Sequence, residues 1–148
     1  MYFYDEIWAK PRYPLEQHVR DCLRLFKLVK RFKKPVALHV AEEAGINVGA
    51  LWDSSFLAVA LHDIGKASIP FQKYIRGEGK KESHAFISFY FTSQICGGKT
   101  HLQFDGYPIG LEALAVSSHH SPLHPSKFEM YRRNEDNPQI MEDKVEQF

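Results

Sequence analysis

The stretch Leu61-His62-Asp63-Ile64-Gly65-Lys66 sets a histidine beside an aspartate at the end of the apolar run Phe56 to Leu61. An imidazole and a carboxylate side by side can ligate the same metal ion, and a carboxylate can bridge two ions. Such a pair taken alone is more often a structural hydrogen bond than a metal site, because perturbed groups also serve structure. The metal interpretation therefore depends on which other side chains can reach this pair.

Apolar residues recur at spacings of three and four along most of the chain, which predicts an all-α fold. The expected helices span about 14–32, 35–44, 48–64, 68–75 (a short helix or turn), 83–96 and a stretch that opens at 105–108 and ends at 118. The polar segments 126–133 and 135–148 also look helical, and 97–100 reads as a turn. We find no convincing strand alternation and no internal repeat. A chain of 148 residues, 44% of them hydrophobic, fits one compact domain.

Several of these helices carry histidines on a face or at an end. His18 lies on the apolar face of 14–32, although an inward histidine is usually a satisfied core residue. His84 falls near the start of 83–96, and His119-His120 end the helix before Pro122. Two consecutive histidines at a helix end are costly to bury without partners and can present two nitrogens to one cavity. We therefore expect a helical bundle with a metal site between its helices.

Charge gives little global attraction to nucleic acid, because the formal net charge is +1. Local basic runs exist at 27–34, 73–81 and 127–133. The residues that could contact a DNA backbone are Lys30, Arg31, Lys73 and Arg76. Each run taken singly is more typical of a solvated helix face or loop.

Cysteine usage and the N-terminus indicate a cytoplasmic protein. Cys22 and Cys96 lie far apart, without C-x-x-C spacing and among apolar residues, so both are interpreted as core thiols. The N-terminus carries Asp5 and Glu6 where a signal peptide would be basic and then apolar. No apolar run approaches the roughly 20 residues that span a bilayer, so we expect a soluble protein without membrane contact.

The order of these motifs resembles the HD superfamily of metal-dependent phosphohydrolases: a histidine, His-Asp followed by Gly-Lys, a later histidine, then a His-His pair. With Ala67, Phe71-Gln72 and Ser118-His119-His120-Ser121, the chain is similar more narrowly to the HD nuclease domain of the CRISPR-associated nuclease-helicase of type I interference. The resemblance covers about residues 14 to 125. It implies an HD-type helical bundle and an endonuclease that cleaves single-stranded DNA in antiviral defence.

The resemblance also implies two metal positions that share Asp63. The first would be held by His18, His62 and Asp63. The second would be held by Asp63, His84, His119 and His120. Lys66 matches a lysine that the family places near the reacting phosphate, so Asp63 and Lys66 are the expected catalytic residues. Ligand sets rich in histidine suit Mn, Fe, Co, Ni or Zn better than Mg.

One departure from the family pattern concerns its last ligand, an aspartate well downstream. Asp136 and Asp143 come too soon and in polar surroundings to match it. We therefore expect residues 1–148 to be a single HD-type domain that lacks its C-terminal helices and carries no helicase domain. The implied partners are single-stranded DNA, a helicase subunit or domain, and a CRISPR surveillance complex. Two alternatives stay open: an HD phosphohydrolase acting on nucleotides or cyclic nucleotides, and a catalytically incomplete metal-binding module.

Overall fold

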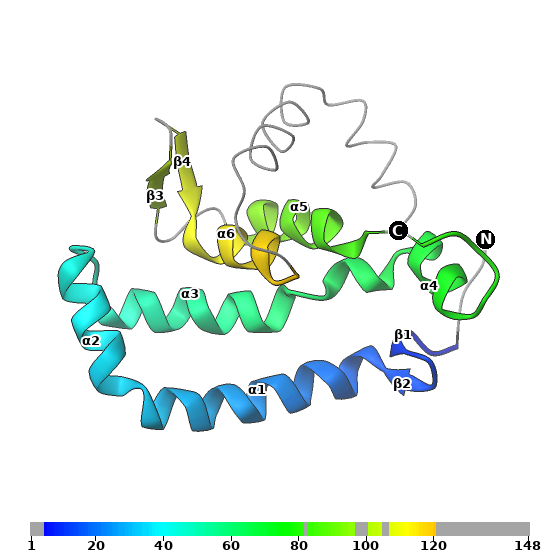
Figure 1. The fold of residues 1–148 in the computed structure, drawn as a ribbon, viewed down its shortest axis with the longest axis horizontal. Coiled ribbons are helices and arrows are strands. Elements are labelled where there is room, and N and C mark those ends of the chain that lie inside the picture. The colour runs from blue at the N-terminus through cyan, green and yellow to red at the C-terminus, as the bar shows by residue number, and fades with distance from the viewer. Residues whose placement is uncertain (1–4, 82, 97–100, 105–106, 121–148) are drawn as a thin grey trace.

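The computed structural model describes residues 5–81, 83–96, 101–104 and 107–120, and these ranges form a mostly helical domain (Figure 1). In chain order the elements are β1 (Trp8–Lys10), β2 (Tyr13–Pro14), α1 (Leu15–Phe32), α2 (Lys34–Glu43), α3 (Val48–Leu61), the short 3-10 helix η1 (Ile64–Ala67), α4 (Ile69–Ile75), α5 (His84–Cys96), β3 (His101–Phe104), β4 (Tyr107–Gly110) and α6 (Leu111–Ser118). The predicted helical bundle is confirmed.

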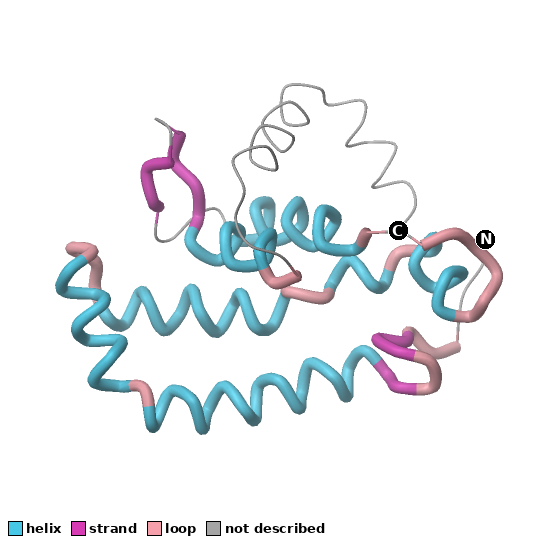
Figure 2. The backbone as a smooth tube through the Cα atoms, in the orientation of Figure 1, coloured by secondary structure: helices cyan, strands magenta, loops and turns pink. Residues whose placement is uncertain are grey.

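Helices α1 and α3 lie side by side and are joined at one end by α2, as Figures 1 and 2 show. Helices α5 and α6 pack against each other and form a second layer on α3. The first turns of α1, the end of α3, the start of α5 and the end of α6 therefore meet in one region. This region contains the sequence motifs that were expected to bind metal.

The turn between α2 and α3 is fixed by local sequence. Gly45 ends α2 with a φ of +64°, a left-handed conformation that glycine adopts without a steric penalty. Asn47 then caps α3, because its Oδ1 accepts hydrogen bonds from the backbone N–H of Gly49 at 2.7 Å and of Ala50 at 3.2 Å. The direction of α3 toward the histidine–aspartate pair is thus set at its N-terminus.

Two short antiparallel hairpins, β1–β2 and β3–β4, differ from the strand-free prediction. Strands of two to four residues are too short to show the alternation that identifies a strand in sequence. Residues Tyr107–Gly110 form β4, so the helix expected to open at 105–108 begins at Leu111. Helix α3 ends at Leu61, not at residue 64, because the chain tightens into η1. The predicted turn 97–100 and the polar segments 126–133 and 135–148 lie outside the described residues.

The buried apolar core lies between α5 and α6, where Phe89 and Ala113 pack together with Phe86 against them. Helix α1 buries none of its residues fully. Its apolar face is half-buried at Cys22 and Phe26 and 43% exposed at Val29. Within the described residues, no single helix is long and apolar enough to cross a membrane, although α2 and Val48–Ala67 meet that criterion as a pair bent by 112°.

Candidate metal centre

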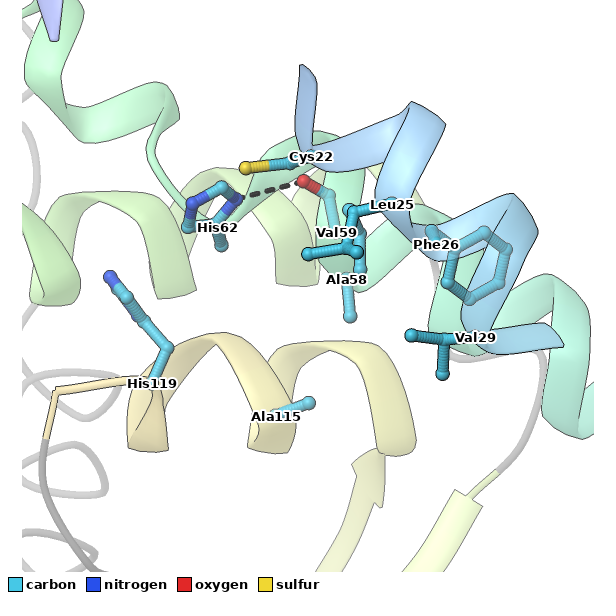
Figure 3. A pocket seen from close by; sticks show the side chains of 9 residues that line it. All are labelled: Cys22, Leu25, Phe26, Val29, Ala58, Val59, His62, Ala115 and His119. Atoms are coloured by element: carbon cyan, nitrogen blue, oxygen red, sulfur yellow. Dashed lines mark hydrogen bonds between the residues drawn. The ribbon is translucent and has the colours of Figure 1, made fainter. Parts of the chain in front are cut away.

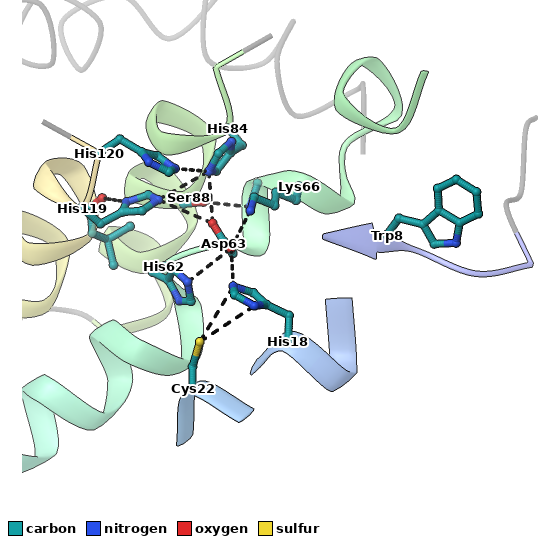
Figure 4. Close-up of polar contacts among 12 residues, drawn as sticks. Trp8, His18, Cys22, His62, Asp63, Lys66, His84, Ser88, His119 and His120 are labelled. Carbon is teal, nitrogen blue, oxygen red and sulfur yellow. Dashed lines mark hydrogen bonds and ion pairs between the residues drawn. The ribbon is translucent and has the colours of Figure 1, made fainter. Parts of the chain in front are cut away.

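Asp63 is the centre of a polar cluster between the helices and is only 2% exposed (Figure 4). Its Oδ2 lies 2.7 Å from Lys66 Nζ, 2.9 Å from His18 Nε2 and 3.2 Å from His62 Nε2. Its Oδ1 lies 3.1 Å from His84 Nε2 and 3.5 Å from His119 Nε2. Each carboxylate oxygen therefore faces its own pair of imidazoles. His18 lies on α1 and His84 on α5, whereas His62 and His119 are the C-cap residues of α3 and α6.

Backbone contacts fix which ring nitrogen faces Asp63. The Nδ1 atom of His62 lies 2.8 Å from the carbonyl oxygen of Val59, and Nδ1 of His119 makes the same kind of contact with Val116. A carbonyl only accepts hydrogen bonds, so each Nδ1 carries a proton, and Nε2 of the ring in its metal-binding, neutral form turns its lone pair toward the carboxylate. A lone pair facing a carboxylate oxygen is repulsive unless a cation or a proton lies between them. Backbone carbonyls commonly orient metal-ligating histidines in this way.

The second predicted metal position is assembled by His84, His119, His120 and Asp63, whose ligand atoms all lie within 4.8 Å of one another. The Nε2 atom of His84 is 2.8 Å from that of His120 and 3.4 Å from that of His119. Metal–ligand bonds of about 2.1 Å place neighbouring ligand atoms about 3.0 to 3.4 Å apart. Asp63 Oδ1 is buried and accepts no hydrogen bond of good geometry, despite its near neighbours. These four residues fit a divalent metal ion.

The first predicted position is assembled by His18 and His62 at Asp63 Oδ2. Cys22 joins them, because His18, Cys22 and His62 form a second group of ligand atoms that lie within 4.8 Å of one another. The structure thus brings all six predicted ligand residues to one place and adds a thiol. Cys22 was interpreted as a core residue, but it is half-buried at the edge of this cluster.

The charge state of the cluster suits metal binding. Burial alone would raise the pKa of Asp63, but the polar contacts with its histidine neighbours and Lys66 hold that pKa well below its usual range. Burial and the neighbouring imidazoles of His119 and His84 lower the pKa of His120 to about 4. At neutral pH the carboxylate is therefore ionised, and His120 keeps the free lone pair that a metal ligand needs.

Lys66, the predicted catalytic lysine, is 9% exposed in η1. Besides its contact with Asp63, its ammonium group lies 5.8 Å from the centre of the Phe71 ring. Gln72 supports this turn, because its Nε2 donates to the carbonyl oxygens of Lys66 at 2.6 Å and Trp8 at 2.8 Å. In the sequence, Gln72 stands out only as a flank of the motif. Its role in joining η1 to β1 depends on a contact between residues 64 positions apart.

Gly65 has a packing role that the sequence did not show. Its N–H donates to Ser88 Oγ at 2.9 Å, which joins η1 to α5. A Cβ atom at this position would lie 2.2 Å from the carbonyl oxygen of His84 and 2.9 Å from the backbone nitrogen of Ser88. The lack of a side chain at Gly65 lets η1 approach the first turn of α5, where His84 is held.

The predicted DNA-contacting residues are divided between two places. Lys30 and Arg31 are exposed in the last turn of α1, about 18 Å along the helix axis from His18. Lys73 and Arg76 are half-buried at the end of α4, much closer along the chain to Lys66. Arg76 already contacts Gln72, donates to the carbonyl oxygen of Glu6 at 2.7 Å and stacks on Trp8. The third basic run lies outside the described residues.

An apolar pocket of about 420 Å³ adjoins the cluster between α1, α3 and α6 (Figure 3). It is lined by Cys22, Leu25, Phe26, Val29, Ala58, Val59, His62, Ala115 and His119. Its two histidines are also members of the cluster, so the pocket and the cluster are continuous. The rest of the lining offers little to a phosphate, which leaves the polar cluster as the place for an anionic group.

A helical bundle that gathers a histidine–aspartate pair and four further histidines between its helices has the architecture expected of an HD-type domain. Two curated proteins, each named CRISPR-associated endonuclease Cas3-HD, are similar to this chain. The protein from Methanocaldococcus jannaschii is 26% identical over 151 residues, covering 97% of this chain and 59% of its own length. The protein from Pyrococcus furiosus is 24% identical over 139 residues, covering 90% and 57%.

These similarities confirm the resemblance to the HD nuclease domain of the CRISPR-associated nuclease-helicase. The chain spans a little under three fifths of the length of these relatives. No family model and no solved structure matches the chain.

Proposed function

We propose that this chain is a metal-dependent nuclease that hydrolyses phosphodiester bonds of single-stranded DNA in CRISPR interference. The proposal is carried by the two carboxylate oxygens of Asp63, which face different histidines. Oδ2 faces His18 and His62, and Oδ1 faces His84 and His119. A carboxylate that presents one oxygen to each of two imidazole groups has the arrangement of a ligand that bridges two metal ions. The names of the two relatives support a nuclease over other HD-type activities.

Asp63, His18 and His62 would hold one ion, and Asp63, His84, His119 and His120 the other. The imidazole-rich donor set favours Mn, Fe, Co, Ni or Zn over Mg. Two such ions would lower the pKa of a water molecule and neutralise the charge on the phosphate during in-line attack. No side-chain nucleophile is then required of the protein.

Lys66 would stabilise the anionic phosphate. Its ammonium group is held within 2.7 Å of Asp63, at the boundary of both histidine groups, so a phosphate at the centre would lie near it. A preorganised cation in a water-poor site stabilises developing negative charge more than the same cation in water. The Phe71 ring and the contacts of Gln72 to η1 keep this cation in position.

The substrate strand would lie along the face that carries Lys73, with Lys30 and Arg31 available to a longer strand. Arg76 is engaged with Gln72 and Glu6, so it would have to exchange these contacts to bind DNA. A helicase subunit or domain and a CRISPR surveillance complex would supply the single strand. These partners are what the motif resemblance implies; the names of the relatives add only the association with CRISPR.

The test begins with protein stripped of metal by a chelator and reloaded in turn with Mn, Ni, Co, Fe, Zn and Mg. Each form receives end-labelled single-stranded DNA, the same sequence as a duplex, and a panel of linear and cyclic nucleotides. We expect cleavage of the single strand with at least one of the transition metals, loss of cleavage in Asp63→Ala, and full cleavage in His39→Ala. His39 is the matched control because it is exposed on α2, away from the cluster.

Two outcomes contradict the proposal. Hydrolysis of nucleotides without cleavage of DNA would identify the chain as a nucleotide phosphohydrolase. Metal binding with no hydrolysis of either substrate would identify a non-catalytic metal-binding module.

A further inference from the structure

The cluster contains a thiol that the proposed mechanism does not use. Cys22 follows His18 by four residues on α1, so both side chains lie on the same face of the helix. Its Sγ atom lies 3.8 Å from His18 Nε2 and 4.0 Å from His18 Nδ1. His18 Nε2 is the nitrogen that also contacts Asp63, as Figure 4 shows.

These separations match a shared metal ion better than a hydrogen bond. Bonds of about 2.3 Å to sulfur and 2.1 Å to nitrogen place the two ligand atoms about 3.6 Å apart around a tetrahedral ion. The observed 3.8 Å is close to this value. It is long for a contact through a proton.

Two independent features point to a ligand beside Cys22. His62 offers a ring nitrogen from the C-cap of α3, within 4.8 Å of Cys22 Sγ. Asp63 Oδ2 lies 2.9 and 3.2 Å from the Nε2 atoms of His18 and His62, so one carboxylate oxygen contacts both imidazoles of the group. The thiol and two imidazoles from α1 and the end of α3 thus form one group, with the carboxylate of Asp63 against its imidazoles.

We propose that Cys22 is a thiolate ligand of the first metal position, together with His18, His62 and Asp63. On binding, the proton of Cys22 Sγ leaves to solvent and a bond from Sγ to the metal forms, with no change of oxidation state. A thiolate favours Zn, Co, Fe or Ni over Mg and Mn. The second position has no sulfur, so the two positions differ in their metal preference.

This inference rests on the metal-binding part of the proposed function and not on DNA cleavage. It is tested by titrating Co²⁺ into the metal-free full chain, without oxygen and with a phosphine reductant. A thiolate bound to Co²⁺ gives an intense near-ultraviolet charge-transfer band that imidazole and carboxylate ligands do not give. The sequence contains two cysteines, so Cys96→Ser is the matched control for Cys22→Ser and Cys22→Ala.

We expect the band in the wild-type protein and in Cys96→Ser, and its loss in both Cys22 variants. The variants should also lose about tenfold or more in affinity for Co²⁺ and Zn²⁺ at one position while the other position keeps its affinity. Circular dichroism establishes that each variant is folded. Bound Co²⁺ without the band in the wild-type protein, or a band that survives in both Cys22 variants, would overturn the assignment.

Failure of this inference and failure of the proposed function give different results. A Cys22-dependent band in a protein that cleaves no DNA supports the thiolate ligand and contradicts only the nuclease. Brisk DNA cleavage by a Co²⁺-loaded protein without the band supports the nuclease and contradicts only the thiolate ligand.

Discussion

The ammonium nitrogen of Lys66 lies 2.7 Å from Oδ2 of Asp63, on the same carboxylate oxygen that His18 and His62 face. Both side chains are largely buried, so water screens the charge of Lys66 only weakly. Its electrostatic interaction with an ion that enters the cluster is correspondingly stronger than at the surface. Its charge opposes a metal ion at the first position and attracts an anion placed there. Metal affinity and phosphate stabilisation should therefore respond in opposite directions when the charge is removed.

Substitution of Lys66 by methionine tests this opposition while keeping an unbranched stem against Phe71. We expect unchanged or tighter metal binding and a fall in turnover of about a hundredfold, the scale on which a single charge-stabilising group contributes. Metal titration and kcat measured on the same preparation provide the two values. A Lys66→Met protein that cleaves DNA at the wild-type rate would restrict Lys66 to its ion pair with Asp63.

Substitution of Asp63 by alanine removes the shared ligand. Because Asp63 supplies one oxygen to each histidine group, we expect Asp63→Ala to lose metal from both positions together with all cleavage. Elemental analysis after dialysis, compared with wild type and with His39→Ala, measures the loss. An equal loss in His39→Ala, or full occupancy of either position in Asp63→Ala, would disprove the bridging assignment.

The parts of the fold that could be predicted from sequence are those with long periodic patterns. The helices at 15–32, 34–43 and 84–96 were predicted within about two residues, because each has apolar spacing over several turns and a proline, glycine or polar cap at an end. The hairpins were missed because strands of two to four residues carry no usable period. The start of α6 was placed too early because residues 105–108 were interpreted as a helix opening, whereas Pro108 lies in β4 and pairs with Gln103 of β3.

The candidate site was predictable to the extent that motif order fixes it. The five expected histidine ligands meet around Asp63, as the motif order predicts. Cys22 was missed because a cysteine four residues after an inward histidine looks like core until the packing of α1 is known. The reason for glycine at position 65 depends on the approach of η1 to α5, which no local pattern contains.

Acidification should empty the two positions at different pH values. Burial lowers the pKa of His62, but its contacts with Asp63 outweigh that effect and raise the pKa above its ordinary value. Burial lowers the pKa of His18, the other imidazole at that position, so His62 is the ligand there that protons reach first. At the second position the pKa of His120 is lowered to about 4. A metal binds the unprotonated ring, so a raised pKa means that protons compete already near neutral pH, and a lowered pKa delays that competition. We expect the position with His62 to lose metal first as pH falls from 8 to 5. The order is checked by measuring metal content across this range, with the Cys22-dependent Co²⁺ band as a marker of the first position. Simultaneous loss from both positions, or loss in the reverse order, would contradict the prediction.

Substitution of Gly65 by alanine should damage the centre without touching a ligand. The new Cβ atom would lie 2.2 Å from the carbonyl oxygen of His84, so η1 and the first turn of α5 must separate. Overpacking of this kind costs about 1 to 3 kcal/mol, and it should also weaken the hydrogen bond from Gly65 to Ser88. Because His84 is the first residue of α5, metal affinity at the second position should fall more than at the first.

Gly79→Ala is the matched control, since its Cβ would meet only the Lys73 side chain and nearby backbone at 3.3 Å or more. Thermal unfolding and Co²⁺ titration of both variants measure the effect, and a Gly65→Ala protein with wild-type stability and two unaltered metal affinities would show that the approach of η1 to α5 does not position His84.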